Sequence, residues 1–171
     1  MNPSCLGAKY LFSAIEYCLE NPKVALRGKV YPYIEEKYNI HTFVLHGICI
    51  GSASAMLASV KKGFPKSVKA LIAEGTYHSF YESFKQPLKE LKKPTYPVIW
   101  QMRSICKRRF GIDVKKESPI EVADKFTLPL LLMSGKCDLY SLPEKCKTLF
   151  DKCASTQKQL VTFEKGAPVA L

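Results

Sequence analysis

The sequence is poor in acidic residues and histidine and has no C-x-x-C motif. Only three histidines occur among 171 residues, and none follows His78. Fifteen Asp and Glu face 26 Lys and Arg, which leaves a net charge of +11. The seven cysteines are an odd number without metal-ligand spacing, so neither a secreted disulfide framework nor a metal site is indicated. We therefore expect reduced thiols, no metal or other cofactor, and a cytoplasmic protein.

Targeting and membrane-spanning patterns are also lacking. The first residues show no basic region followed by an apolar one, so no secretory signal is visible. Residues 43–60 form an 18-residue stretch without charged side chains, which is long enough to span a membrane. That stretch holds His46, two glycines and three serines, so its hydrophobicity is weak. A strand, a turn and a buried helix explain it better.

The composition favours one folded domain over residues 1–171. Apolar residues make up 47% of the chain and charged residues 24%, which is an ordinary globular balance that excludes disorder and fibres. The length suits a single domain, and no internal repeat is visible.

Strand and helix patterns alternate along the chain. Apolar spacing predicts helices over 10–20, 30–37 and 52–62, and apolar runs predict strands over 42–46, 66–73, 128–134 and 159–164. Ser141 and Glu144 have the spacing of a capping box before another helix, on which Cys146 and Cys153 fall on the apolar face. This order predicts an α/β fold with a mostly parallel sheet.

The segment 80–118 departs from the alternation and is strongly basic. It carries ten Lys and Arg against four Asp and Glu, with Tyr96 and Trp100 among the charges. We expect an amphipathic, partly helical cap inserted into the domain. Its clusters at 107–109 and 115–116 are expected either to form a solvated surface or to bind an anionic partner weakly, such as lipid head groups, nucleic acid or an acidic substrate. No nucleic-acid-binding motif accompanies them, so specific nucleic-acid recognition is not expected.

The most informative motif is G-x-C-x-G, formed by Gly47, Cys49 and Gly51 between a predicted strand and a predicted helix. Glycines flank the central residue of such a turn because side chains there would collide with the strand and helix. The turn lifts Cys49 to the carboxyl end of the sheet, at a helix N-terminus that stabilises anions. The backbone N–H of Ile50 is then a candidate oxyanion donor.

This arrangement resembles the α/β-hydrolase superfamily, particularly its intracellular esterase-like and serine-aminopeptidase-like members. The resemblance covers roughly residues 30 to 171 and includes, in the family's order, AEG at 73–75, SPIE at 118–121, LPLLLMSGKCD at 128–138 and FEKGA at 163–167. It implies a three-layer, mostly parallel sheet like the C-terminal part of that fold, with a helical cap insertion.

The resemblance assigns the nucleophile position to Cys49, as in dienelactone-hydrolase-like members, and the acid position to Asp138. The family's base histidine would follow the last strand, where this chain has Pro168. His78, at the carboxyl end of the strand 66–73, is an alternative base, with Glu74 to orient it. His46 lies inside a predicted strand and is expected to be a hydrogen-bonded core residue.

The family also has several strands before the nucleophile turn, whereas the 46 residues before Gly47 are mostly helical in pattern. The chain is then either a truncated gene product, or a protein partner covers an exposed sheet edge. Three functions remain open. They are an acyl hydrolase (ester, thioester or peptide) acting on a small-molecule acyl substrate through Cys49, a catalytically inactive hydrolase remnant (a pseudoenzyme), and a basic binding or scaffold protein.

Overall fold

The computed structural model describes residues 36–37, 39, 41–111 and 113–164. The helix expected over 10–20, most of that expected over 30–37, and the position of Pro168 lie outside these residues. The stretch 43–60 contains a strand and a helix, as expected. Across the described ranges, no helix is long and apolar enough to cross a membrane.

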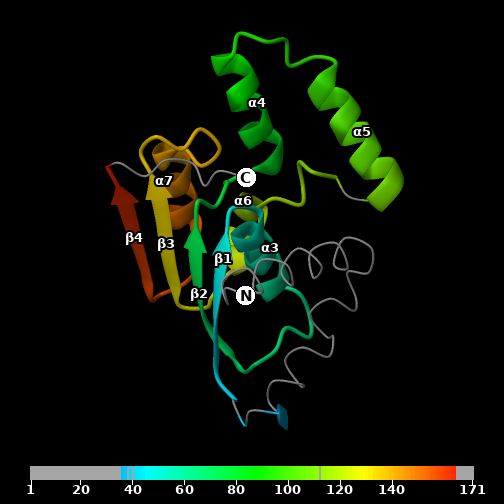
Figure 1. Cartoon of the computed structure of the whole chain (residues 1–171). Helices are drawn as coiled ribbons and strands as arrows, with labels where there is room; N and C mark the ends of the chain where they lie inside the picture. Colours follow the sequence, from blue (N-terminus) through cyan, green and yellow to red (C-terminus); the bar gives the residue numbers. More distant parts are fainter. Residues whose placement is uncertain (1–35, 38, 40, 112, 165–171) are drawn as a thin grey trace.

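The centre of the fold is a four-stranded sheet (Figure 1). Its strands are β1 (Phe43–Ile48), β2 (Val68–Glu74), β3 (Leu130–Gly135) and β4 (Lys158–Phe163). They lie side by side in chain order, and every neighbouring pair is parallel. The four predicted strands are thus all present, with ends shifted by one or two residues, and the mostly parallel α/β fold is confirmed.

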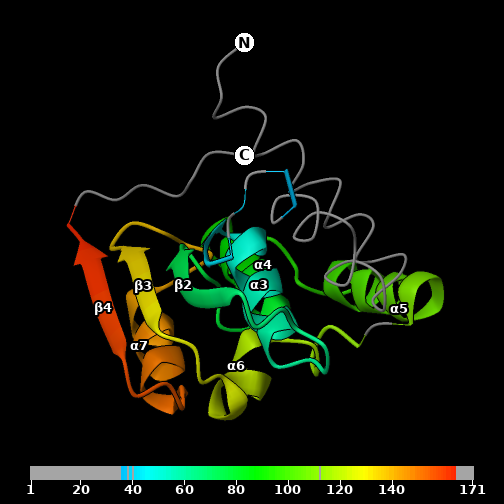
Figure 2. The same ribbon diagram turned by 90° about the horizontal axis from the view of Figure 1, so that it is seen from below.

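One face of this sheet is covered by helices α3 (Ile50–Ser59), α6 (Pro119–Val122) and α7 (Pro143–Lys152). Helix α6 contacts both α3 and α7, and Figure 2 shows the three on the same side of the sheet. A short 3-10 helix, η1 (Ala123–Lys125), leads from α6 toward β3. The core lies between these helices and the sheet and consists of Met56, Leu71, Ala73, Ala123, Phe126, Leu130, Leu132, Cys146, Leu149 and Cys153. The predicted burial of Cys146 and Cys153 is confirmed.

The other face of the sheet is more exposed. Side chains alternate along β1, so Val44, His46 and Ile48 point away from α3 and are exposed. The prediction that His46 is a core residue is therefore wrong, because no described helix covers its face. The described residues supply two of the three expected layers. Since β1 is an edge of the described sheet, its coverage by a partner stays a prediction.

Two longer helices, α4 (Phe80–Glu90) and α5 (Val98–Phe110), lie between β2 and β3 in the chain. They contact each other and lie beyond the carboxyl ends of the strands (Figure 1). A bidentate ion pair between Arg103 and Asp113 joins α5 to the chain that returns to the sheet. The expectation that the basic segment is partly helical is met by these two helices.

Candidate functional site

Cys49 occupies a strained turn between β1 and α3. Its backbone has φ 51° and ψ −113°, a left-handed conformation that residues with a side chain rarely adopt. A Cβ atom on Gly47 would lie 2.5 Å from the Cα of Ser52, so only glycine fits there. Gly51 is buried in the first turn of α3. The chain around Cys49 therefore makes a tight, strained turn between the strand and the helix.

The surroundings of the Cys49 thiol oppose its ionisation. Burial raises the pKa of Cys49, and the nearby Asp138 carboxylate raises this pKa further, while a hydrogen bond from the backbone N–H of Ile50 lowers it. Ile50 is the first residue of α3, so its N–H belongs to the unsatisfied donors of a helix start. The expected oxyanion donor therefore lies beside the thiol.

Asp138 lies in the loop after β3, at the same end of the sheet as Cys49. It is buried, and its Oδ1 accepts hydrogen bonds from the N–H groups of Tyr140 (2.9 Å) and Ser141 (3.1 Å). Gly75 lies between the two loops, with φ +57°, and a Cβ there would be 3.4 Å from Asp138 Oδ2. The fold therefore brings the predicted nucleophile and acid to one edge, separated by one strand.

His78 has charged neighbours other than the predicted pair. Burial lowers the pKa of His78, Lys145 lowers it further, and Glu82 and Glu121 oppose the shift. Glu74 hydrogen-bonds to His46 at 3.3 Å, so the prediction that Glu74 orients His78 is wrong. The reason is register, since Ile48 pairs with Glu74 and β1 thereby places His46 beside that carboxylate.

A chain of buried hydroxyls beneath the turn was not predicted from the sequence. Ser52 donates to the carbonyl of Cys49 (2.7 Å), and Thr76 donates to the Ser52 hydroxyl (2.6 Å). Ser141 donates to the Thr76 carbonyl (2.8 Å) and lies 2.8 Å from the Cys146 sulfur. The chain connects the loops that carry Cys49 and Asp138.

This use of Ser141 overturns the capping-box prediction. Helix α7 begins at Pro143 with Leu142 as its N-cap, and no side chain caps it. The hydroxyl of Ser141 is committed to Thr76, which is 65 residues away in sequence and invisible to local pattern.

Tyr77 is a further residue near the thiol that the sequence did not indicate. It is buried, and both this burial and the charge of Cys49 raise its pKa. Its ring packs edge-on against Phe80 at the start of α4. An aromatic residue after a strand is too common a pattern to mark a site.

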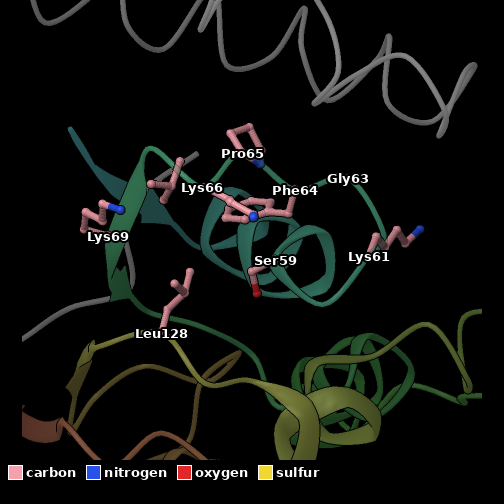
Figure 3. Close-up of a pocket in the computed structure, with 9 residues that line it drawn as sticks. Ser59, Lys61, Gly63, Phe64, Pro65, Lys66, Lys69 and Leu128 are labelled. Atoms are coloured by element: carbon pink, nitrogen blue, oxygen red, sulfur yellow. The ribbon is translucent and has the colours of Figure 1, made fainter. Parts of the chain in front are cut away.

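A cavity of about 540 Å³ among the described residues lies far from Cys49 and Asp138. Its lining comes from the end of α3, the chain that leads into β2 and Leu128 before β3, so it is at the amino ends of the strands (Figure 3). Lys61, Lys66 and Lys69 surround it. Across the described residues, no group of three or more His, Cys, Asp and Glu side chains could hold a metal ion.

The raised pKa makes a testable prediction for the alkylation of Cys49. Less thiolate is present at pH 7 than in a free thiol, and only the thiolate reacts. We expect the iodoacetamide reaction rate of Cys49 to rise with pH to a midpoint above that of Cys49 in the urea-unfolded protein, measured by mass spectrometry of the Cys49 peptide. A midpoint below that of the unfolded protein would contradict this and reveal an activating group beside the sulfur.

Comparison with known proteins identifies the fold. No family model matches the sequence, and no curated protein matches it. Among solved structures, mouse α/β hydrolase domain-containing protein 10 has a TM-score of 0.52 at 17% identity over 81% of this chain. An α/β hydrolase enzyme from the sediment metagenome of the Mar Chica lagoon, Morocco, has a TM-score of 0.52 at 18% identity over 82% of this chain. The acylaminoacyl peptidase of Pyrococcus horikoshii has a TM-score of 0.59 at 16% identity over 82% of this chain.

These structures share the arrangement of this chain but are longer. The chain spans 58% of the mouse protein, 58% of the metagenomic enzyme and 22% of the peptidase. The described sheet and its helices therefore have the α/β-hydrolase fold. They correspond to only part of the length of those proteins. At such identities the likeness concerns fold, and function depends on the residues of the site itself.

Proposed function

We propose that the protein is an acyl hydrolase that acts on a small-molecule ester, thioester or peptide through Cys49. The observation that carries this proposal is the strained backbone of Cys49 at the N-terminus of α3, where the N–H of Ile50 is one of the first donors of the helix. A strained conformation costs about 1–3 kcal/mol and persists where its surroundings enforce it, commonly at functional sites. The hydrolase fold of the neighbours supports the same reaction class.

The reaction would proceed in two steps, acylation of Cys49 and hydrolysis of the acyl-enzyme. The Cys49 thiolate attacks the acyl carbonyl carbon, the bond to the alcohol, thiol or amine breaks, and that group leaves with a proton. Water then attacks the acyl-Cys49 thioester, releasing the carboxylic acid and restoring the thiol. The Ile50 N–H, at the start of α3, would donate to the oxyanion in both steps.

Proton transfer in this scheme needs a base, for which we propose His78. Its lowered pKa keeps the imidazole neutral at pH 7, which is the form that accepts a proton. Glu82 and Glu121, whose charges raise the pKa of His78, would stabilise the positive charge that follows. Without such a base, the raised pKa of Cys49 predicts slow acylation.

The test combines thiol labelling with turnover. The purified protein is incubated with a thiol-reactive acylating probe and p-nitrophenyl acetate, and the labelled peptide is identified by mass spectrometry. We expect acyl-Cys49 and measurable hydrolysis, both lost in Cys49→Ala and hydrolysis reduced in His78→Gln. Cys137→Ala is the matched control, because Cys137 is exposed and lies outside the proposed machinery.

A second function is favoured by the same thiol environment. Burial and the Asp138 charge both hold Cys49 in its unreactive protonated form, as suits a hydrolase fold that has lost catalysis and keeps a binding role. A folded sample that shows neither acyl-Cys49 nor turnover above the buffer rate would overturn the hydrolase proposal and favour this alternative.

A further inference from the structure

The connection between α4 and α5 exposes an unusual set of apolar side chains. The exposed fractions are 64% for Leu91, 72% for Tyr96, 51% for Val98 and 59% for Trp100. We call these four residues the apolar tip. Large apolar groups gathered at one exposed place usually mark a binding surface. The connection projects away from the sheet, at the top of the molecule in Figure 1.

This exposure is built into the local structure. The N–H of Leu91 bonds to the carbonyl of Pro87, and the N–H of Lys93 bonds to that of Leu88, which closes the end of α4. Ile99 is only 4% exposed and anchors the first turn of α5, while its neighbours Val98 and Trp100 are exposed. The apolar tip is thus held outward by backbone hydrogen bonds and one buried anchor.

Lysines flank the apolar tip on the α4 side. Lys89, Lys92 and Lys93 are exposed, and none forms an ion pair with another described residue. By contrast, Lys85 pairs with Glu82, and Arg103 pairs with Asp113. Glu90 is the one acidic residue within the segment 89–93 and accepts a hydrogen bond from Gln86, so a net positive charge lies beside the exposed apolar groups.

The combination of groups has a specific physical meaning. Trp and Tyr rings favour the boundary between water and hydrocarbon, where the apolar body is buried and the polar edge stays hydrated. Lysines next to them gain about 1 kcal/mol each near a negatively charged leaflet. An acidic protein partner would satisfy the lysines, but a bilayer satisfies both the lysines and a projecting apolar tip at once.

We propose that the apolar tip and its three lysines dock onto an anionic phospholipid bilayer. The apolar side chains enter the headgroup boundary, and the ammonium groups contact the lipid phosphates and carboxylates. Because α4 and α5 lie beyond the carboxyl ends of the strands, docking brings that edge of the sheet toward the bilayer (Figure 1). The proposal does not depend on catalysis by Cys49.

The test uses the natural fluorescence of the protein. Trp100 is the only tryptophan in the chain, so the emission of the full-length protein reports on the apolar tip itself. The protein is titrated with vesicles of phosphatidylcholine containing 30% phosphatidylserine and with vesicles of phosphatidylcholine alone. We expect a blue shift and co-sedimentation with the anionic vesicles, and binding that weakens as salt is raised.

Two variants and one control separate the contribution of the lysines from that of the apolar side chains. The triple variant Lys89→Gln, Lys92→Gln, Lys93→Gln is expected to bind anionic vesicles about 100-fold more weakly, from about 1 kcal/mol per lysine. The matched control, Lys61→Gln, Lys66→Gln, Lys69→Gln, removes the same charge around the distant cavity and should change affinity less than about threefold. The variant Leu91→Ser, Tyr96→Ser, Val98→Ser is expected to lose the blue shift, and circular dichroism verifies that each variant is folded.

Three results would overturn the proposal. One is an unchanged Trp100 emission with anionic vesicles, and another is an equal loss of affinity in both lysine variants, which would indicate general charge attraction. The third is a blue shift only with an added acidic protein or nucleic acid, which would assign the apolar tip to that class of partner instead.

Discussion

Gly47→Ala is expected to lower the free energy of unfolding by about 3 kcal/mol or more, or to prevent folding altogether. An added Cβ would lie 2.5 Å from the Cα of Ser52, 2.6 Å from its N and 2.8 Å from the carbonyl carbon of Gly51. All three atoms belong to the backbone of α3, so no side-chain rotation relieves the overlap. The start of α3 would have to move away from β1. Urea unfolding followed by circular dichroism measures the effect.

The matched control is Gly111→Ala, which adds the same atom at the end of α5. No atom lies within 4 Å of that Cβ, so the cost is only that of φ +68° in a residue with a side chain, about 1 kcal/mol. If the two variants lost equal stability, the close approach of α3 to β1 at Gly47 would be refuted.

Phe126→Ala is expected to destabilise the protein by about 3–5 kcal/mol, because it removes a large, fully buried side chain from the core. Phe126 follows η1, and it belongs to the same buried cluster as Leu132 and Leu149. The cavity cannot collapse easily between a strand and a helix. The measurement is the urea midpoint, with an unchanged denaturant slope indicating that the native state keeps its compactness.

Phe163→Ala is the control for this second variant. Phe163 ends β4, at one edge of the described sheet, and is 49% exposed, so its removal should cost about 0.5 kcal/mol or less. A loss at Phe126 no greater than that at Phe163 would show that the helices do not seal this face of the sheet as described.

Much of the architecture could be predicted because its signals are local. The central strands β2 and β3 lie in apolar stretches next to Pro65 and Gly135, and such stretches are typical of buried parallel strands. The turn at Cys49 was equally visible, since only a glycine leaves room for the close approach at Gly47. Fold class, strand order along the chain and the position of the strained turn at Cys49 were therefore determined by the sequence.

The surroundings of the site were decided by contacts between distant segments. A histidine in an apolar strand suggested burial, but the side of the sheet that receives helices depends on the crossovers, and His46 is exposed beside Glu74. Ser141 had the spacing of a helix cap, yet its hydroxyl bonds to Thr76, which only strand pairing brings near. The same is true of the charge on Asp138 near Cys49.

The sequence by itself thus determined which elements form and where the strained cysteine lies, because steric overlap and apolar periodicity act between neighbours in the chain. Only the tertiary structure decided the ionisation of Cys49, the partners of His46, His78 and Ser141, and the exposure of Trp100. Burial and charge act through space, so these properties depend on residues that are far apart in the chain.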